Sequence, residues 1–188
     1  MTGKIVVFCA PSGAGKTTIA RAVQKAIPSL HFSVSATTRP ARPMEADGVD
    51  YFFLTRDQFM KRVSDQEFIE WEEVFGNLYG TLLSHVRDMI DQGMHVILDI
   101  DVKGGLNIKK QFQHRALTIF IEPPDLEVLI ARLKARNTES EESLRRRLDR
   151  VPMEMELGKQ FDVRVVNDQL ETAIADCTRI ISQFLEKE

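Results

Sequence analysis

Short apolar runs recur along the chain and alternate with stretches of helical periodicity. The apolar runs are rich in β-branched residues, which favour strands, and they cover residues 5–10, 30–35, 95–100, 116–121 and 163–167. Apolar residues at helical spacing separate most of these runs, at residues 17–27, 84–92, 125–136 and, after the last run, 170–185. Strands that alternate with helices of this length predict an α/β fold, with a parallel five-stranded sheet covered by helices on both faces.

Two segments interrupt this alternation. Residues 36–82 contain further apolar runs at 49–54 and 68–75, with a short helical stretch at 56–65 between them. This pattern indicates a small mixed α/β insertion with strands of its own. The second segment, residues 137–156, is strongly charged and begins with acidic residues, which are favoured in the first turn of a helix.

The first apolar run passes directly into a glycine-rich loop and then into a helical stretch, as a phosphate-binding P-loop requires. Gly13 and Gly15 allow backbone N–H groups to turn inward around an anion. Lys16 can reach the terminal phosphates of a nucleotide, and Thr17 is placed to bind Mg²⁺. The loop predicts binding of a nucleoside triphosphate, although Ala10 replaces the usual first glycine. Its residues are Ala10, Pro11, Ser12, Gly13, Ala14, Gly15, Lys16, Thr17 and Thr18.

Two carboxylates follow the apolar run at 95–100. Because ligands of open parallel sheets bind beyond the carboxyl ends of the strands, Asp99 and Asp101 are expected to face the P-loop. The alternation of side chains along a strand places both on the same side. Asp99 is suited to hold Mg²⁺ or one of its waters.

A third polar cluster lies at the start of the insertion. Pro40 and Pro43 favour an extended loop, which presents Arg39 and Arg42. A guanidinium group can form bidentate hydrogen bonds with two oxygens of a phosphate. The chain's two tyrosines, Tyr51 and Tyr79, belong to the same insertion and can add hydroxyl donors. This segment predicts a second anion site.

The composition narrows the classes of partner. With 188 residues, 43% of them hydrophobic, and a net charge of −3, the chain can bury a core but lacks the basic surface of a general nucleic-acid binder. No segment resembles a signal peptide or approaches the roughly 20 apolar residues of a membrane span. We expect a cytoplasmic protein without nucleic-acid or membrane partners, in which Cys9 and Cys177 are reduced and buried.

These motifs resemble those of the guanylate kinases, over nearly the whole chain. Besides the P-loop, the resemblance is carried by residues 33–43, 48–53, 68–71, 79–81, 99–101 and 165–168. It implies transfer of a phosphoryl group from ATP to GMP, and also to dGMP, with Mg²⁺ as cofactor. It further implies a lid at residues 125–156, a GMP-binding insertion at 36–82, and a core formed by residues 1–35, 83–124 and 157–188.

The resemblance also implies roles for individual residues. The phosphate of GMP is assigned to Arg39, Arg42, Tyr51 and Tyr79, and guanine to Ser35, Glu70, Thr81 and Asp101. ATP is assigned to the P-loop, Arg132 and Asn167, and Mg²⁺ to Thr17 and Asp99. Catalysis of the transfer is assigned to Lys16, Arg39, Arg42, Arg136 and Arg147.

Two of these roles also follow from the residues themselves. A carboxylate such as Glu70 can accept hydrogen bonds from N1–H and N2–H₂ of guanine together, whereas adenine presents an acceptor at N1 and would leave a buried carboxylate unpaired. In the lid, Arg145 and Arg146 have acidic residues four positions earlier, in the favourable orientation for helical ion pairs. Arg147 has Ser143 at that offset, which favours Arg147 for binding a phosphate.

Three residues depart from the family pattern, and two other functions remain open. The departures are Asn137 for a usual glycine, Lys103 for a usual glutamine, and Leu78 where an aromatic residue is frequent. A P-loop kinase of another phosphorylated small molecule, such as ribose 1,5-bisphosphate, would not need Glu70 and Asp101 arranged for guanine. A non-catalytic scaffold with this fold tends to lose the P-loop lysine and lid arginines, which are present here.

Overall fold

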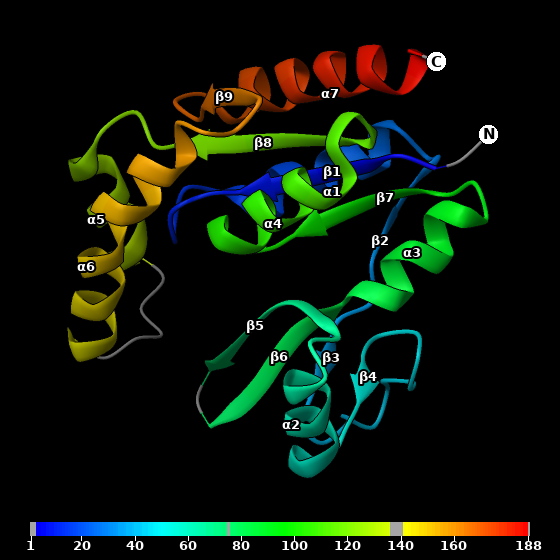
Figure 1. Ribbon diagram of the computed structural model, residues 1–188. Coiled ribbons are helices and arrows are strands. Elements are labelled where there is room, and N and C mark those ends of the chain that lie inside the picture. Colours follow the sequence, from blue (N-terminus) through cyan, green and yellow to red (C-terminus); the bar gives the residue numbers. More distant parts are fainter. Residues whose placement is uncertain (1–2, 75, 136–140, 188) are drawn as a thin grey trace.

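The computed structural model describes residues 3–74, 76–135 and 141–187, and its strands form two separate sheets (Figure 1). In the larger sheet all neighbouring strands are parallel. Its order is β2 (Leu30–Phe32), β7 (His95–Asp99), β1 (Ile5–Cys9), β8 (Ala116–Glu122) and β9 (Val163–Val166). The predicted α/β fold with a parallel five-stranded core is therefore confirmed.

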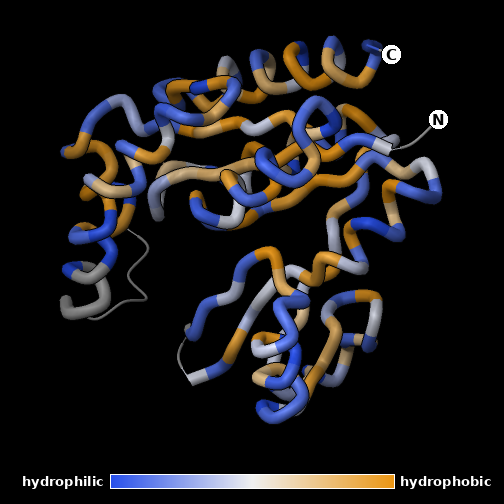
Figure 2. The backbone as a smooth tube through the Cα atoms, in the orientation of Figure 1, coloured by the Kyte–Doolittle hydropathy of each residue, from blue (hydrophilic) through white to orange (hydrophobic). Residues whose placement is uncertain are grey.

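The side chains of β1 show how the parallel sheet is covered on both faces. Val6 and Phe8 belong to one hydrophobic core, and the alternating residues Ile5, Val7 and Cys9 belong to the other. Every residue of β1 is apolar and buried, and Figure 2 shows the central strands of the sheet as predominantly hydrophobic. The first core is completed by α1 (Lys16–Ala26), α5 (Leu126–Ala135) and α7 (Leu170–Glu186), and the second by α3 (Leu83–Asp91) and α4 (Val102–Phe112).

The helix α4 was not predicted from the sequence. Two glycines, Gly104 and Gly105, occupy its first turn, and glycine lowers helix propensity by about 1 kcal/mol per residue relative to alanine. Two other features stabilise the helix. The Asp101 carboxylate caps its N-terminus by accepting a hydrogen bond from the N–H of Gly104 at 2.7 Å, and Ile108 and Phe112 are buried against the sheet.

The smaller sheet is built from strands that all lie between residues 36 and 82. Its order is β4 (Phe52–Phe53), β3 (Ala36–Thr37), β6 (Asn77–Leu82) and β5 (Phe68–Val74). The pair β5 and β6 is an antiparallel hairpin, whereas β3 and β4 are parallel. A capping box starts α2 (Arg56–Ser64), which buries Phe59 against Phe68 with ring centroids 4.3 Å apart. The predicted bounds of the insertion enclose this sheet, and the division into domains stays a prediction.

Two predicted strands are shorter than expected. The run at 30–35 ends as a strand at Phe32, and the run at 49–54 forms a strand only at Phe52–Phe53. Before β4 the backbone turns instead, because the Asp50 carboxylate accepts the N–H of Ala46 at 2.8 Å. Side chains of this kind compete with the hydrogen bonds of a strand.

The segment predicted to form a lid contains α5 and α6 (Glu141–Gly158), which Figure 1 shows beyond the carboxyl ends of the parallel strands, and its role as a lid stays a prediction. A short 3₁₀ helix, η1 (Gln113–Arg115), joins α4 to β8. Among the described residues, no helix is both long and apolar enough to cross a membrane. Cys9 and Cys177 are buried free thiols, as predicted.

Candidate functional site

A cleft of about 510 Å³ lies where the P-loop, the smaller sheet and α6 meet. Most of the residues predicted for the site line it, although they come from segments far apart in the sequence. These are Ala10, Pro11, Ser12, Gly13, Gly15, Lys16, Thr17, Thr18, Ser35, Tyr51, Glu70, Tyr79, Asp99, Asp101 and Arg147.

The P-loop connects β1 to α1 at one end of this cleft. Gly13 and Gly15 have φ angles of 91° and 93°, in the left-handed region that glycine adopts without strain. A Cβ atom on Gly15 would also overlap the side-chain amide of Asn167. No side chain caps the N-terminus of α1, so its first N–H groups suit an anion in the cleft.

Lys16, Thr17 and Asp99 form a polar cluster beside the loop. The Lys16 ammonium lies 2.8 Å from Asp99 Oδ1 and donates to the carbonyl of Ile100 at 2.7 Å. The Thr17 hydroxyl donates to Asp99 Oδ2 at 2.6 Å. Burial is the largest influence on the pKa of Lys16 and lowers it, but Asp99, Cys9 and Glu70 together outweigh burial, so the pKa is raised and the ammonium stays charged.

This cluster also fits a magnesium ion held together with a nucleotide. Mg²⁺ in such sites takes one or two protein oxygens and fills its other positions with phosphate oxygens and water. The Thr17 hydroxyl and the Asp99 carboxylate supply that set. The described residues contain no group of three or more His, Cys, Asp or Glu side chains that could hold a metal without a substrate.

At the other end of the cleft, Glu70 and Asp101 lie against the first turn of α4. Thr81 donates to Glu70 Oε1 at 2.7 Å, and Thr81 is itself buried. A Cβ atom on Gly104 would lie 2.7 Å from Glu70 Cγ, so only glycine permits this close approach. Burial raises the pKa of Glu70 to about 7, with a smaller contribution from Asp101 and opposing contributions from Thr81 and Lys16.

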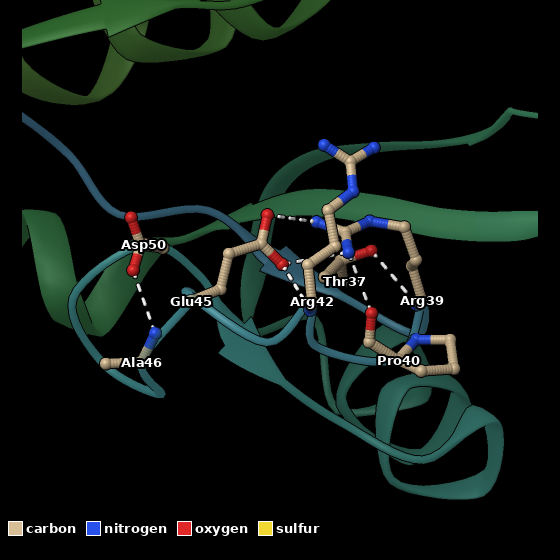
Figure 3. Close-up of polar contacts among 7 residues, drawn as sticks. All are labelled: Thr37, Arg39, Pro40, Arg42, Glu45, Ala46 and Asp50. Atoms are coloured by element: carbon tan, nitrogen blue, oxygen red, sulfur yellow. Dashed lines mark hydrogen bonds and ion pairs between the residues drawn. The ribbon is translucent and has the colours of Figure 1, made fainter.

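Arg39 and Arg42 lie in the loop beside the cleft rather than in its lining. The Arg39 guanidinium lies 5.4 Å from the centroid of the Tyr51 ring, and this ring is in edge contact with Tyr79. Figure 3 shows that Arg39 is ion-paired with Glu45. The hydrogen bond with Glu45 is the main cause of the raised pKa of Arg39, and Tyr79 contributes to it.

Ala14, Asn167 and Arg132 lie behind the P-loop and do not line the cleft. The Asn167 side-chain N–H donates to the carbonyl of Ala14 at 2.7 Å, and both terminal nitrogens of Arg132 donate to the Asn167 carbonyl at 3.1 Å. These contacts brace the loop. The predicted contact of Arg132 and Asn167 with ATP stays a prediction.

On α6, Arg147 lies over the P-loop and donates to the Ser12 hydroxyl at 2.6 Å. Arg136 and Asn137 lie outside the described residues, so the role of Arg136 stays a prediction. Of the other departures from the family pattern, Leu78 is buried in the core of the smaller sheet and Lys103 is exposed on α4.

Glu154, a buried acid of α6 that lines the cleft, was not predicted from the sequence. Its Oε1 atom lies 3.3 Å from Arg150, which in turn lies 3.7 Å from Glu72 on β5. Its Oε2 atom is buried without a hydrogen-bond partner among the described residues, and burial raises its pKa. Glu154 follows Arg147 by seven positions, so helical spacing could have identified it as sharing a face with Arg147.

A P-loop at one end of a cleft, a buried carboxylate at the other and two arginines in the adjoining loop define the class of P-loop nucleotide kinases. Comparisons with known proteins then specify the family. The family model "Guanylate kinase" matches residues 2–184. The chain belongs to the guanylate kinase family, which confirms the resemblance and the kinase activity inferred from the motifs.

Individual relatives agree over nearly the whole chain. It is 49% identical to a guanylate kinase of Chlorobium luteolum, over 97% of this chain and 93% of the relative. It is 52% identical to a guanylate kinase of Salinibacter ruber, over 96% of each chain. The crystal structure of guanylate kinase from Anaplasma phagocytophilum matches with a TM-score of 0.70 and 32% identity, and covers 99% of this chain and 88% of that one.

Proposed function

We propose that the chain transfers the γ-phosphoryl group of ATP to GMP, or to dGMP, and so forms ADP and the corresponding diphosphate. The choice of GMP as the acceptor is supported above all by the buried Glu70–Thr81 pair opposite the P-loop. Neither a sugar phosphate kinase nor a scaffold needs a buried carboxylate there.

Glu70 selects guanine through its hydrogen-bonding capacity. One of its oxygens accepts from Thr81, and an ionised carboxylate has further lone pairs for N1–H and N2–H₂ of guanine. Adenine offers no donor at N1, so it would leave the carboxylate desolvated and unpaired, at a cost of about 1–3 kcal/mol per lost bond or more for a charged group. Asp101 and Ser35, which line the same cleft, complete the base site.

Arg39, Arg42 and the hydroxyls of Tyr51 and Tyr79 bind the phosphate of GMP. The two tyrosines line the cleft, and Arg39 stacks against Tyr51. This arrangement aims a phosphate oxygen at the donor nucleotide. That oxygen is already ionised at neutral pH, so the reaction needs no general base from the protein.

The P-loop N–H groups and Lys16 hold the β- and γ-phosphates of ATP. To do so, Lys16 exchanges its hydrogen bond to the Ile100 carbonyl for phosphate oxygens. Thr17 and Asp99 would hold Mg²⁺, which neutralises developing charge on the phosphates when bound. Asn167 and Arg132 keep the loop in place and bind ATP, with Asn167 on the side of the adenine.

In the transfer, the GMP oxygen forms a bond to the γ-phosphorus while the bond to the β–γ bridging oxygen breaks and ADP leaves. Positioning and charge neutralisation supply most of the catalysis in such reactions. Lys16, Arg39, Arg42, Arg136 and Arg147 supply the positive charge. The lid excludes water, which limits hydrolysis of ATP. Location in the cytoplasm stays a prediction, consistent with the free thiols.

The acceptor assignment is tested by Glu70→Gln in steady-state kinetics. Glutamine keeps the size of the side chain but replaces one acceptor oxygen by a donor. We expect the KM for GMP to rise at least ten-fold and the KM for ATP to change less than two-fold, since loss of a hydrogen bond to a charged group costs about 1.5–3 kcal/mol. Equal effects on both substrates would remove Glu70 from the base site.

A further inference from the structure

The loop that carries the two arginines contains a carboxylate, Glu45, that the predicted site does not include. Its Oε1 accepts from Nη2 of Arg39 at 2.9 Å, and its Oε2 accepts from Nη1 at 2.9 Å. Both side chains are only 16% exposed. Glu45 therefore binds the end of the Arg39 guanidinium with two parallel hydrogen bonds, the strongest geometry available to an arginine and a carboxylate.

This ion pair leaves a second edge of the Arg39 guanidinium for other partners, and a hydrogen bond with Tyr79 also raises the pKa of Arg39. Nη1 donates its other hydrogen to the carbonyl of Pro40 at 2.7 Å. A guanidinium has five N–H groups in a fixed plane. Glu45 and Pro40 use three of them, which leaves Nε–H and the second N–H of Nη2. These two point the same way and form a second fork that suits two oxygens of a phosphate.

Glu45 also holds the backbone that carries Arg42. Its Oε2 accepts from the backbone N–H of Arg42 at 2.8 Å, and its own N–H donates to the Arg42 carbonyl at 3.0 Å. In Figure 3 the Arg42 side chain points away from the ion pair. Among the described residues, the Arg42 guanidinium forms no hydrogen bond or ion pair, so all its donors remain for a ligand.

The aromatic rings next to Arg39 place this assembly at the wall of the cleft. The Arg39 guanidinium lies 5.4 Å from the Tyr51 centroid and 5.8 Å from the Phe53 centroid. Tyr51 and Tyr79 line the cleft, and Tyr79 also interacts with Arg39. Glu45 thus fixes one arginine by its side chain and the other by its backbone, beside two tyrosine rings.

We propose that Glu45 is a positioning residue for the phosphate of the acceptor nucleotide, which orders Arg39 and the Arg42 backbone before that phosphate binds. This inference rests on the proposed function, in which both arginines bind the GMP phosphate. Glu45 stays in place when the phosphate binds, because the fork that Glu45 and Pro40 do not use lies on a different edge of Arg39 from the ion pair. The gain is pre-organisation, since an arginine that is already fixed loses less conformational entropy on binding.

The direction in which removal of Glu45 changes the affinity for GMP distinguishes a positioning role from competition with the phosphate. If Glu45 occupied the phosphate site and had to be displaced, its removal would tighten the binding of GMP. Removal of its negative charge would also reduce repulsion of the phosphate. Weaker binding after removal of Glu45 therefore points to positioning.

The test compares GMP with guanosine, which lacks the phosphate, by calorimetric titration of the full chain. We expect Glu45→Gln to weaken the binding of GMP about ten-fold, as loss of one ordered side chain would, and to leave that of guanosine unchanged. Glu67→Gln is the matched control, because Glu67 is also ion-paired with an arginine of the insertion, Arg62, but does not line the cleft. It should change neither affinity.

Tighter binding of GMP by Glu45→Gln would overturn the proposal, and so would equal weakening of GMP and guanosine, which marks a structural role alone. If the glutamine variant does not fold, the affinities for GMP and guanosine are compared in Glu45→Asp, which keeps the charge on a shorter side chain. GMP phosphorylation by the unaltered chain tests the proposed function separately. Its absence would refute that function whatever the ratio of affinities.

Discussion

The binding of guanine is predicted to tighten as the pH rises from 6 to 8. Burial raises the pKa of Glu70 to about 7, so the group titrates near neutrality. Only the ionised carboxylate can accept from N1–H and N2–H₂ of guanine together while it also accepts from Thr81. The protonated form is the one that burial favours, and it must lose its proton before guanine binds.

The size of the effect follows from the fraction of Glu70 that is ionised. With a pKa of about 7, that fraction is about 0.1 at pH 6, about 0.5 at pH 7 and about 0.9 at pH 8. The apparent Kd is the intrinsic Kd divided by the fraction of the protein that can bind. The Kd of a guanine ligand should therefore fall about ten-fold between pH 6 and pH 8.

Guanosine is the ligand for this assay, because the second ionisation of a phosphate group, with a pKa of about 6, would overlap the titration if GMP were used. The Kd is measured by calorimetry at intervals of pH. Glu70→Gln is the control and should bind guanosine weakly at every pH. A guanosine Kd that is constant in the unaltered chain, or that rises with pH, would refute the assignment of Glu70.

Three further predictions concern Glu70 and the P-loop. The folded chain keeps a proton on Glu70 that the unfolded chain releases above pH 4.5, so the free energy of unfolding falls as pH rises to about 7. In urea denaturation at pH 8, Glu70→Gln should therefore be up to about 3 kcal/mol more stable than the unaltered chain. An unchanged or lower stability of this variant would contradict the prediction. Lys16→Met should abolish turnover while circular dichroism shows an intact fold, and normal turnover would exclude the P-loop from catalysis. Gly15→Ala should weaken ATP binding at least ten-fold by displacing Asn167, a loss of about 1.4 kcal/mol. Gly76→Ala is the control, since Gly76 also has a positive φ but no atom lies near the added Cβ. Equal ATP affinity in the two variants would show that a clash with Asn167 does not weaken ATP binding.

The parts of the molecule with local signals were predictable from the sequence. The run at 5–10 predicts a buried strand because every residue of β1 is apolar. The glycines that follow it in the P-loop have the positive φ angles that the motif requires. Lys16, Thr17 and Asp99 meet in space because parallel strands end at the same edge of a sheet. These signals do not depend on distant contacts.

The missed features depend on tertiary contacts. The helix α4 forms despite two glycines because it packs on the sheet, and one of these glycines, Gly104, makes room for Glu70 on β5. The pairing of Arg39 with Glu45 bridges an irregular proline-containing loop, where no periodicity relates the two residues. From the sequence alone Glu154 is an ordinary charged residue of a helix, and only the structure shows that it is buried beside the cleft.

The most direct test of the central claim is ADP production by the purified protein with ATP and Mg²⁺, measured separately with GMP, dGMP, AMP, CMP, UMP and ribose 1,5-bisphosphate. We predict strong turnover with the guanine nucleotides and little with the other acceptors, because only guanine pairs with the buried Glu70–Thr81 site. Turnover with the sugar phosphate alone, or with none of the acceptors in protein that still binds ATP, would contradict the account.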